Sequence, residues 1–470
     1  MPPAGELAIV LHTHMPYVEG GAPWPPPDRD AFLREPEGFG TWPFGEEWLW
    51  EAIASSYLPL LDMLGRAPLT LSLTPVLCDQ LEAPGTIHRC LRFLRDVRPE
   101  SHRLDIEELR REGHLQLVAE LDRSAAEYAE TAERLEAIGD RLVSRLGVHA
   151  SWTSAATHAV LPLMATDVGL ELQIQTGISS HRRRFGRWDG GFWLPECARA
   201  PWLDPLLSEE GVRSTCVELT GLFGLGDPRH LTPLAMDGGP VLWPLDREVV
   251  SLVWADSGYP AAGPYRDYHR HTTHHHRAWR NDGEPYNFDE ARALAAQHAR
   301  DFVGRVSGRV RDGGVCVCAL DTELLGHWWY EGVHWLGSVL EESARQHLRL
   351  TTLDDALGRN DPVRAPAELP VSSWGSGGDL RTWSGPPVAD LAWQARTAEL
   401  KLLAAPAPPN PRAIRELFAL QSSDWAFLTY RQLAGEYPRE RARGHARALE
   451  RALAGDAGLE PRLRNLAPHL

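Results

Sequence analysis

The sequence reads Val315-Cys316-Val317-Cys318-Ala319-Leu320-Asp321 at the point that best indicates its fold. An unbroken apolar run of this length is typical of a strand that is buried on both faces of a parallel sheet. The charged Asp321 then emerges at the carboxyl end of the strand, which is the catalytic rim in an α/β barrel. The stretch therefore predicts a β-strand that delivers a carboxylate to an active site.

Similar apolar runs ending in polar residues recur through the first three quarters of the chain. The predicted strands are Leu7–His14, Leu69–Pro75, Leu115–Glu120, Glu171–Thr176, Ser214–Glu218, Val249–Trp254 and Val315–Asp321. Helical patterns such as Ser124–Leu146 lie between several of them, which implies an α/β fold with a parallel sheet and right-handed crossovers. A barrel of the (β/α) kind is favoured over an open doubly wound sheet, because no glycine-rich phosphate turn follows the first strand.

The pattern changes at the Pro- and Gly-rich stretch Asn360–Pro370. Beyond it the sequence predicts helices at Leu391–Leu403, Pro411–Ser422 and Glu436–Leu453. We therefore expect a catalytic barrel over residues 1–365, with a helical insertion near 79–112, and an α-helical C-terminal domain over 366–470.

Composition excludes several classes of partner. The 470 residues are 43% hydrophobic, which allows a large core and excludes disorder. A net charge of −16 argues against nucleic acid and against an anionic membrane surface. Six cysteines without a CxxC pair suit a reducing compartment, and neither a signal peptide nor a membrane-length apolar segment is evident, so we expect a cytoplasmic protein. The oligomeric state stays open.

Two carboxylates stand at places where glycoside chemistry would need them. Glu196 lies in Gly191-Phe192-Trp193-Leu194-Pro195-Glu196-Cys197, among apolar and aromatic neighbours. An acid at a helix start, bound to its own amides, is an equally good interpretation of that stretch alone. Asp321 is followed by Trp328-Trp329-Tyr330, which suits a sugar-stacking wall. One carboxyl of such a pair protonates the leaving oxygen, and the other attacks carbon or activates water.

Histidines form a second group of candidates. His12 and His14 alternate along the first strand and share a face at its carboxyl end. They are either metal ligands or neutral imidazoles that bind sugar hydroxyls. His158 is a third candidate, although a lone histidine is more often a core residue. The histidine-rich tract at 269–276 is interpreted as a solvated loop rather than a metal site.

Taken together, these stretches resemble glycoside hydrolase family 57, and most closely its α-glucan branching members. Five blocks of the family occur in order along the chain: Leu11–Tyr17, Thr157–Leu163, Gly191–Cys197, Leu320–Gly332 and Ser423–Phe427. The segments Ser373–Gly378 and Tyr286–Val303 are also similar to the branching type.

The resemblance implies an incomplete, TIM-like (β/α)7 barrel with a helical C-terminal domain, and a retaining double displacement. Glu196 would be the nucleophile and Asp321 the acid/base, with carboxyls about 5–5.5 Å apart. Neither a metal nor another cofactor is implied, and the partner would be an α-glucan polymer such as amylose or glycogen. The residues expected to bind the glucan or to close the site over it are His12, His14, Trp24, His158, Trp193, His327, Trp328, Trp374, Trp383, Asp424 and Trp425.

Two departures from the family pattern leave alternatives open. The stretch Thr220–Pro240 offers Phe223 and His230 but lacks the tyrosine that usually tips a loop covering the site. Water would then compete with the acceptor, so a 1,4-α-glucan hydrolase or a 4-α-glucanotransferase is the alternative to branching. The usual aromatic after the nucleophile is replaced by Arg199, which would pair with a carboxylate near the donor sugar or lie solvated at the rim. Two alternatives belong to other functional classes. One is a metal-dependent carbohydrate deacetylase that uses His12 and His14. The other is a glucan-binding module whose catalytic site is inactive.

Overall fold

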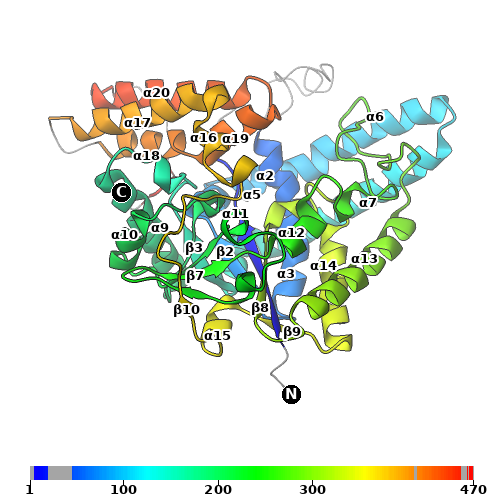
Figure 1. Ribbon diagram of the computed structural model, residues 1–470. Coiled ribbons are helices and arrows are strands. Elements are labelled where there is room, and N and C mark those ends of the chain that lie inside the picture. The colour runs from blue at the N-terminus through cyan, green and yellow to red at the C-terminus, as the bar shows by residue number, and fades with distance from the viewer. Residues whose placement is uncertain (1–4, 20–44, 407–409, 457–462, 464, 469) are drawn as a thin grey trace.

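Seven parallel strands form a curled sheet at the centre of the molecule (Figure 1). The computed structural model describes residues 5–19, 45–406, 410–456, 463, 465–468 and 470. The strands run in the spatial order β8-β1-β2-β3-β4-β5-β7. Their bounds are β1 (Glu6–Thr13), β2 (Thr70–Leu73), β3 (Ala150–Ser154), β4 (Gly191–Trp193), β5 (Ser214–Val217), β7 (Val241–Pro244) and β8 (Val315–Asp321).

The sheet curls until its two ends meet. The amide of Asp246, just beyond β7, donates to the carbonyl of Val317 in β8 at 3.0 Å. Three short strands extend the sheet: β9 (Arg349–Thr351) runs parallel to β1, β6 (Leu234–Ala235) runs antiparallel to β7, and β10 (Val363–Arg364) pairs with β6. The predicted fold class, an α/β protein with an incomplete (β/α)7 barrel, is confirmed by this topology.

Four of the predicted strands are correct and three are wrong. Leu115–Glu120 begins α7 (Leu115–Ile138), Glu171–Thr176 lies within α9 (Asp167–Phe185), and Val249–Trp254 lies within α12 (Arg247–Trp254). A short apolar run does not distinguish a buried strand from the inner face of a helix. The strands that replace them, β3, β4 and β7, are five residues or fewer in length and carry polar residues, glycine or proline.

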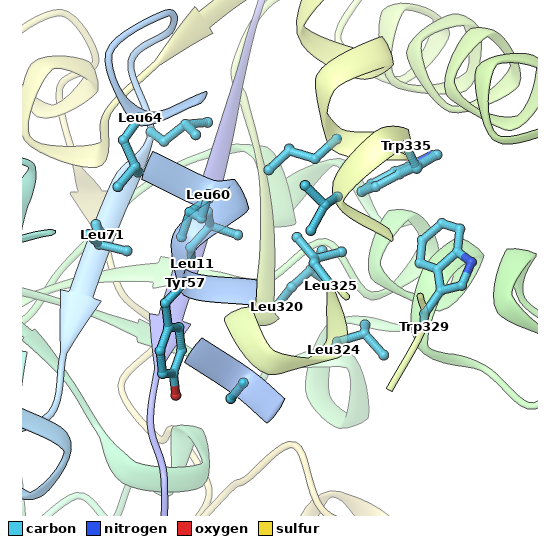
Figure 2. Close-up of a cluster of buried hydrophobic side chains, with 14 of the residues drawn as sticks. Leu11, Tyr57, Leu60, Leu64, Leu71, Leu320, Leu324, Leu325, Trp329 and Trp335 are labelled. Carbon is cyan, nitrogen blue, oxygen red and sulfur yellow. The ribbon is translucent and has the colours of Figure 1, made fainter. Parts of the chain in front are cut away.

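Apolar side chains from neighbouring strands meet the surrounding helices in the largest core cluster (Figure 2). Leu11 of β1, Leu71 of β2 and Leu320 of β8 pack there with Tyr57 and Trp335. All residues of β1 are buried, as expected for a parallel strand covered on both faces. Burial of this kind holds the carboxyl ends of β1 and β8 in register, with His12 beside Asp321.

Helices fill the chain between β2 and β3. They are α4 (Pro75–Leu81), α5 (Thr86–Arg92), α6 (Arg98–Arg111), α7 and α8 (Leu142–Gly147). α6 and α7 pack against each other as a hairpin that projects to one side of the sheet (Figure 1). The helical excursion therefore begins near the predicted position and extends beyond residue 112. The other barrel-side helices are α2 (Glu46–Ala52), α3 (Leu58–Leu64), α10 (Leu203–Glu209), α11 (Thr220–Phe223), α13 (Phe288–Arg309), α14 (Gly332–Arg345) and α15 (Leu353–Leu357).

The last part of the chain forms a helical layer at one end of the sheet (Figure 1). Its helices are α16 (Arg381–Ser384), α17 (Ala389–Leu403), α18 (Pro411–Leu420), α19 (Ser423–Arg431) and α20 (Tyr437–Leu453), and they share a core of their own. The division into units over 1–365 and 366–470 stays a prediction, and β10 of the sheet lies just before that boundary. None of the helices that the structure describes has the length and apolar character to cross a membrane.

Candidate active site

The turn after β4 holds Glu196 in an unusual backbone conformation. Glu196 has φ 63° and ψ 19°, and Cys197 follows with φ 49°. Residues other than glycine adopt this left-handed region at a cost, and such residues gather at active sites. The residue is 8% exposed, and its Oε2 accepts a hydrogen bond of 2.7 Å from the indole of Trp374. The interpretation of Glu196 as an acid at the start of a helix does not describe this contact, because the partner comes from a distant segment.

Asp321 ends β8 and interacts electrostatically with Glu196. Burial raises the pKa of Glu196 to about 7, while the hydrogen bond from Trp374 acts in the opposite direction. Burial raises the pKa of Asp321 well above its usual value, and the negative charges of Glu196 and Glu323 raise it further. Neighbouring carboxyls do not ionise together readily. The site therefore combines a carboxyl that receives a donor with one that favours its protonated form, as acid–base chemistry requires.

Three histidines stack beside these carboxyls. His12 and His158 share a hydrogen bond of 2.9 Å between their Nε2 atoms, and burial lowers the pKa of both rings well below the usual value. His14 stacks on His158 with ring centroids 4.1 Å apart. Although burial lowers the pKa of His14, the neighbouring charge of Asp424 and a hydrogen bond of 2.9 Å to it raise the pKa overall. These surroundings thus favour the neutral forms of His12 and His158, whereas Asp424 favours the protonated form of His14.

The helical layer supplies Asp424 to the barrel site. The amide of Ser423 donates to the carbonyl of His158 at 3.1 Å, and the Ser423 hydroxyl lies 2.8 Å from Nδ1 of the same ring. This contact aligns the start of α19 with the carboxyl end of β3. Burial alone would raise the pKa of Asp424, but the charge and hydrogen bond of His14 lower it. Trp425 points the other way, because it is buried in the helical core and donates to the carbonyl of Ala419.

The predicted tryptophans fall into different environments. Trp193 is buried, with ring centroids 4.7 Å from His12 and 5.1 Å from Trp374. Trp383 is only 2% exposed and packs in the helical core, and its contact with the glucan stays a prediction. Trp24 lies outside the described residues. The placement of Trp383 reflects a buried tryptophan's apolar area, which local sequence does not separate from a sugar-stacking surface.

His327 and Trp328 lie on the loop beyond β8. Trp328 is 39% exposed, and its ring stacks on Tyr268 with centroids 4.5 Å apart. His327 is buried beside Arg277, and burial lowers its pKa to about 3. Both side chains line a pocket between this loop and the α6–α7 hairpin. The residues that line this pocket include neither Glu196 nor Asp321, and none of the three stacked histidines.

Two residues of the site were not expected from the sequence. Trp254 ends α12, is 42% exposed, and lies nearly parallel to Trp374 with ring centroids 6.5 Å apart. The incorrect strand prediction over Val249–Trp254 concealed it. Glu323 accepts hydrogen bonds from the Tyr57 hydroxyl at 2.6 Å and the His14 amide at 3.1 Å. Its position two residues after Asp321 was a usable signal.

The two departures noted in the sequence have definite structures. Phe223 and His230 of Thr220–Pro240 are both buried and pack together, so neither ring projects over the site. Arg199 is also buried, contrary to a solvated rim position, and pairs with Asp204 rather than with a carboxyl of the donor site. Neither expectation for Arg199 is correct, because residues 370–374 cover the turn that carries it.

One group of side chains has the spacing of a metal site. Ligand atoms of His14, His158 and Asp424 lie within 4.8 Å of one another, and it is the one such group among the residues that the structure describes. Nε2 of His14 is already hydrogen-bonded to Asp424, so an ion would have to displace a proton from that pair. The expectation that the site uses no metal stays a prediction.

This chain is similar in sequence to several known proteins. A family model described as glycosyl hydrolase family 57 matches residues 151–368, and one described as the C-terminal part of 1,4-alpha-glucan branching enzyme matches residues 410–458. A probable 1,4-alpha-glucan branching enzyme of Mycobacterium tuberculosis is 32% identical, over 99% of this chain and 95% of that protein. The 1,4-alpha-glucan branching enzyme of Thermococcus kodakarensis is 30% identical, over 95% of this chain and 73% of that protein.

A solved structure extends the similarity to the whole fold. The branching enzyme of this type from Pyrococcus horikoshii superimposes with a TM-score of 0.82 at 30% identity, covering 99% of this chain and 94% of that one.

Proposed function

Because this chain belongs to glycosyl hydrolase family 57, we propose that it is a retaining 1,4-α-glucan branching enzyme. It would cleave an α-1,4 linkage and transfer the released chain to a 6-hydroxyl of an acceptor glucan. The observation that carries the proposal is the pair of interacting carboxyls, Glu196 and Asp321, at the carboxyl ends of β4 and β8. Similarity to branching enzymes along nearly the full chain supports the choice of reaction.

In the first step Glu196 acts as the nucleophile. Its carboxylate oxygen bonds to the anomeric carbon while the bond from that carbon to the leaving 4-oxygen breaks. Asp321 donates its proton to that oxygen, so the leaving chain departs with a free hydroxyl. The elevated pKa of Asp321 supports this role, since the proton must be present before cleavage.

In the second step the acceptor removes the chain from the enzyme. Its 6-hydroxyl attacks the anomeric carbon of the glycosyl–enzyme, the ester bond to Glu196 breaks, and Asp321 receives the hydroxyl proton. Two displacements at one carbon retain the α configuration. Water in place of the 6-hydroxyl would give hydrolysis, and a 4-hydroxyl would give 4-α-glucanotransfer.

The groups around the carboxyls are suited to a neutral sugar. Neutral His12 and His158 would accept or donate hydrogen bonds to the donor sugar hydroxyls, and the His14–Asp424 pair would hold a further hydroxyl. Trp374 and Trp254 offer ring faces for stacking. Because such binding requires no cationic surface, the net charge of −16 suits an α-glucan partner. We further propose a role in building a glycogen-like polymer in the cytoplasm, which the six free, buried cysteines support.

Product analysis on amylose tests this function. The protein is incubated with unbranched amylose, new α-1,6 anomeric protons are measured by NMR, and reducing ends are counted in the same samples. Branching predicts α-1,6 signals that exceed the rise in reducing ends. A rise in reducing ends without α-1,6 signals indicates the hydrolase, and redistribution of chain lengths without either indicates 4-α-glucanotransfer. Asp122→Asn on the exposed face of α7 is the control and should behave as the parent.

A further inference from the structure

Arg199 occupies a closed environment next to the nucleophile turn. Its side chain is fully buried, Nε donates to Oδ1 of Asp204 at 3.0 Å, and Nη2 pairs with the second oxygen of the same carboxylate. Nη1 reaches the carbonyl of Pro370 at 3.4 Å. A bidentate guanidinium–carboxylate pair restricts orientation more than a single contact does. Arg199 is therefore held rigidly between α10 and the segment that passes over the turn.

That segment, the strap over residues 370–374, is fastened at two places. The amide of Arg199 donates to the carbonyl of Ser372 at 2.9 Å, and the Ser372 amide returns a bond of 3.0 Å. Two residues further on, the Trp374 amide donates to the carbonyl of Glu196 at 3.1 Å. The Trp374 indole then donates to the Glu196 carboxylate. The strap thus connects Arg199 to the reacting carboxyl through backbone and side-chain bonds.

Asp204 is confined as closely as its partner. It lies in the first turn of α10, and a side-chain carbon added at Gly239 would come within 2.9 Å of its Cβ. The turn before β7 therefore packs directly against Asp204, and both residues of the ion pair are buried. Separation of a buried pair leaves an uncompensated charge, so the pair does not exchange readily with solvent.

We propose that the Arg199–Asp204 pair is a clasp that positions Trp374 on the nucleophile Glu196. The inference rests on the proposed function, in which Glu196 attacks the anomeric carbon. Arg199 is then a positioning residue, acting through the strap and without touching the sugar. If the clasp is loosened, the strap shifts, the indole no longer donates to the carboxylate, and the attacking oxygen loses its alignment. Misplacement of a reacting group by about 1 Å costs up to about 100-fold in rate.

The test compares Arg199→Met with two related variants. We expect kcat to fall about 10- to 100-fold with little change in KM, because the sugar contacts remain. The acid limb of the pH–kcat/KM profile should move to higher pH, since the Trp374 bond favours the ionised Glu196. Four other groups also face the Glu196 carboxyl and are unchanged in this variant: His14, Asp424, His158 and Ser423. Arg199→Lys should lie between parent and Met, and Arg199→Met with Asp204→Leu should restore stability without restoring the profile.

Arg184→Met is the matched control. Arg184 forms a similarly buried pair with Asp79 between α9 and α4, away from the strap, and it also pairs with Glu82. Its loss should lower the melting temperature while the pH profile stays unchanged. If Arg199→Met and Arg184→Met have the same effects on kcat and on the profile, the clasp is structural only and the proposal is wrong.

A spectroscopic measurement separates this inference from the proposed function. The indole N–H resonance of Trp374 is assigned by its loss in Trp374→Phe and followed by NMR against pH, which requires no turnover. Arg199→Met should shift that resonance and move its titration midpoint upward. An inactive parent with this shift would refute the function and support the clasp. An active parent with an unmoved resonance would refute the clasp alone.

Discussion

The carboxyl ends of β4 and β8, which we call the two rims of the site, each present one carboxyl group. The two rims hold this group in different ways. Glu196 sits in a strained three-residue turn and receives a hydrogen bond from Trp374. Asp321 ends a regular, seven-residue strand, and its interacting neighbours are the carboxyls Glu196, Glu323 and Asp424. Donors stabilise a carboxylate, whereas burial among like charges stabilises the acid. The difference teaches that surroundings, and not residue type, would distinguish the proposed nucleophile from the proposed proton donor.

Substitution of the two carboxyls should have the largest effects, and the two variants should respond differently to an activated substrate. Glu196→Gln removes the proposed nucleophile and should lower kcat by about 10⁴-fold or more. Asp321→Asn removes proton transfer and should cost about 10²–10⁴-fold on amylose. With an activated aryl α-glucoside, whose leaving group needs no proton, Asp321→Asn should recover its first step while Glu196→Gln does not. Burst kinetics measure this, and equal recovery in both variants would reverse or abolish the assigned roles.

A matched pair of smaller changes sharpens the comparison. Trp374→Phe removes the donor to Glu196, so the pKa of that carboxyl rises and the acid limb of the profile moves to higher pH, by about one unit. Activity should thus fall more at pH 6 than at pH 8. The profile of kcat/KM measures the shift, and circular dichroism checks that the fold is intact. A profile that keeps its acid limb would mean that the indole does not tune Glu196.

Tyr57→Phe acts on the opposite rim. The Tyr57 hydroxyl lowers the pKa of Glu323, which burial raises to about 7. Without that donor Glu323 ionises at higher pH, so less negative charge faces Asp321 and its pKa falls. The basic limb should therefore move to lower pH by about half a unit, while the acid limb is retained. Movement of the acid limb instead would show that the two rims are not separately controlled.

The long strands were the part of the fold that could be predicted. β1 and β8 have seven or eight residues that are almost wholly buried, and such runs are recognisable. β4 has three residues, and its existence depends on pairing with β3 and β5, which lie elsewhere in the chain. The amphipathic α12 resembled a strand because the inner face of a short helix is also an apolar run.

The same distinction between local and long-range information applies to the residues of the candidate site. Asp321 ends a strand that its own sequence predicts, and Glu196 stands in a short motif of apolar and aromatic residues, so local sequence locates both. Trp374 acts on a carboxyl 178 residues away, and the Arg199 pair depends on a strap that only the folded chain brings over the turn. Trp383 and Trp425 are expected at the glucan, and the structure buries both rings in the helical core. Local sequence does not reveal how far an indole ring is buried.

Tryptophans near the two rims should make smaller contributions. Trp254 lies over Trp374 on the β4 side, and Trp328 lies on Tyr268 beyond β8. Substitution of either by alanine should raise KM for amylose about 3- to 10-fold, as expected from about 0.5–1.5 kcal/mol of stacking. Trp393→Ala on the outer face of α17, where the ring is 66% exposed, is the control and should leave KM unchanged. If Trp328→Ala also behaves as the parent, the glucan runs only along the β4 side.

The smallest expected effect concerns the three groups between the rims. His14, His158 and Asp424 have the spacing of a metal site, but His14 and Asp424 satisfy each other by a hydrogen bond and opposite charge. Exhaustive dialysis against a chelator should therefore leave kcat and KM on amylose unchanged, with metal content checked by elemental analysis. Loss of activity that returns with Zn²⁺ would mean that an ion, rather than the charge difference between Glu196 and Asp321, organises the reaction, and would favour the metal-dependent deacetylase.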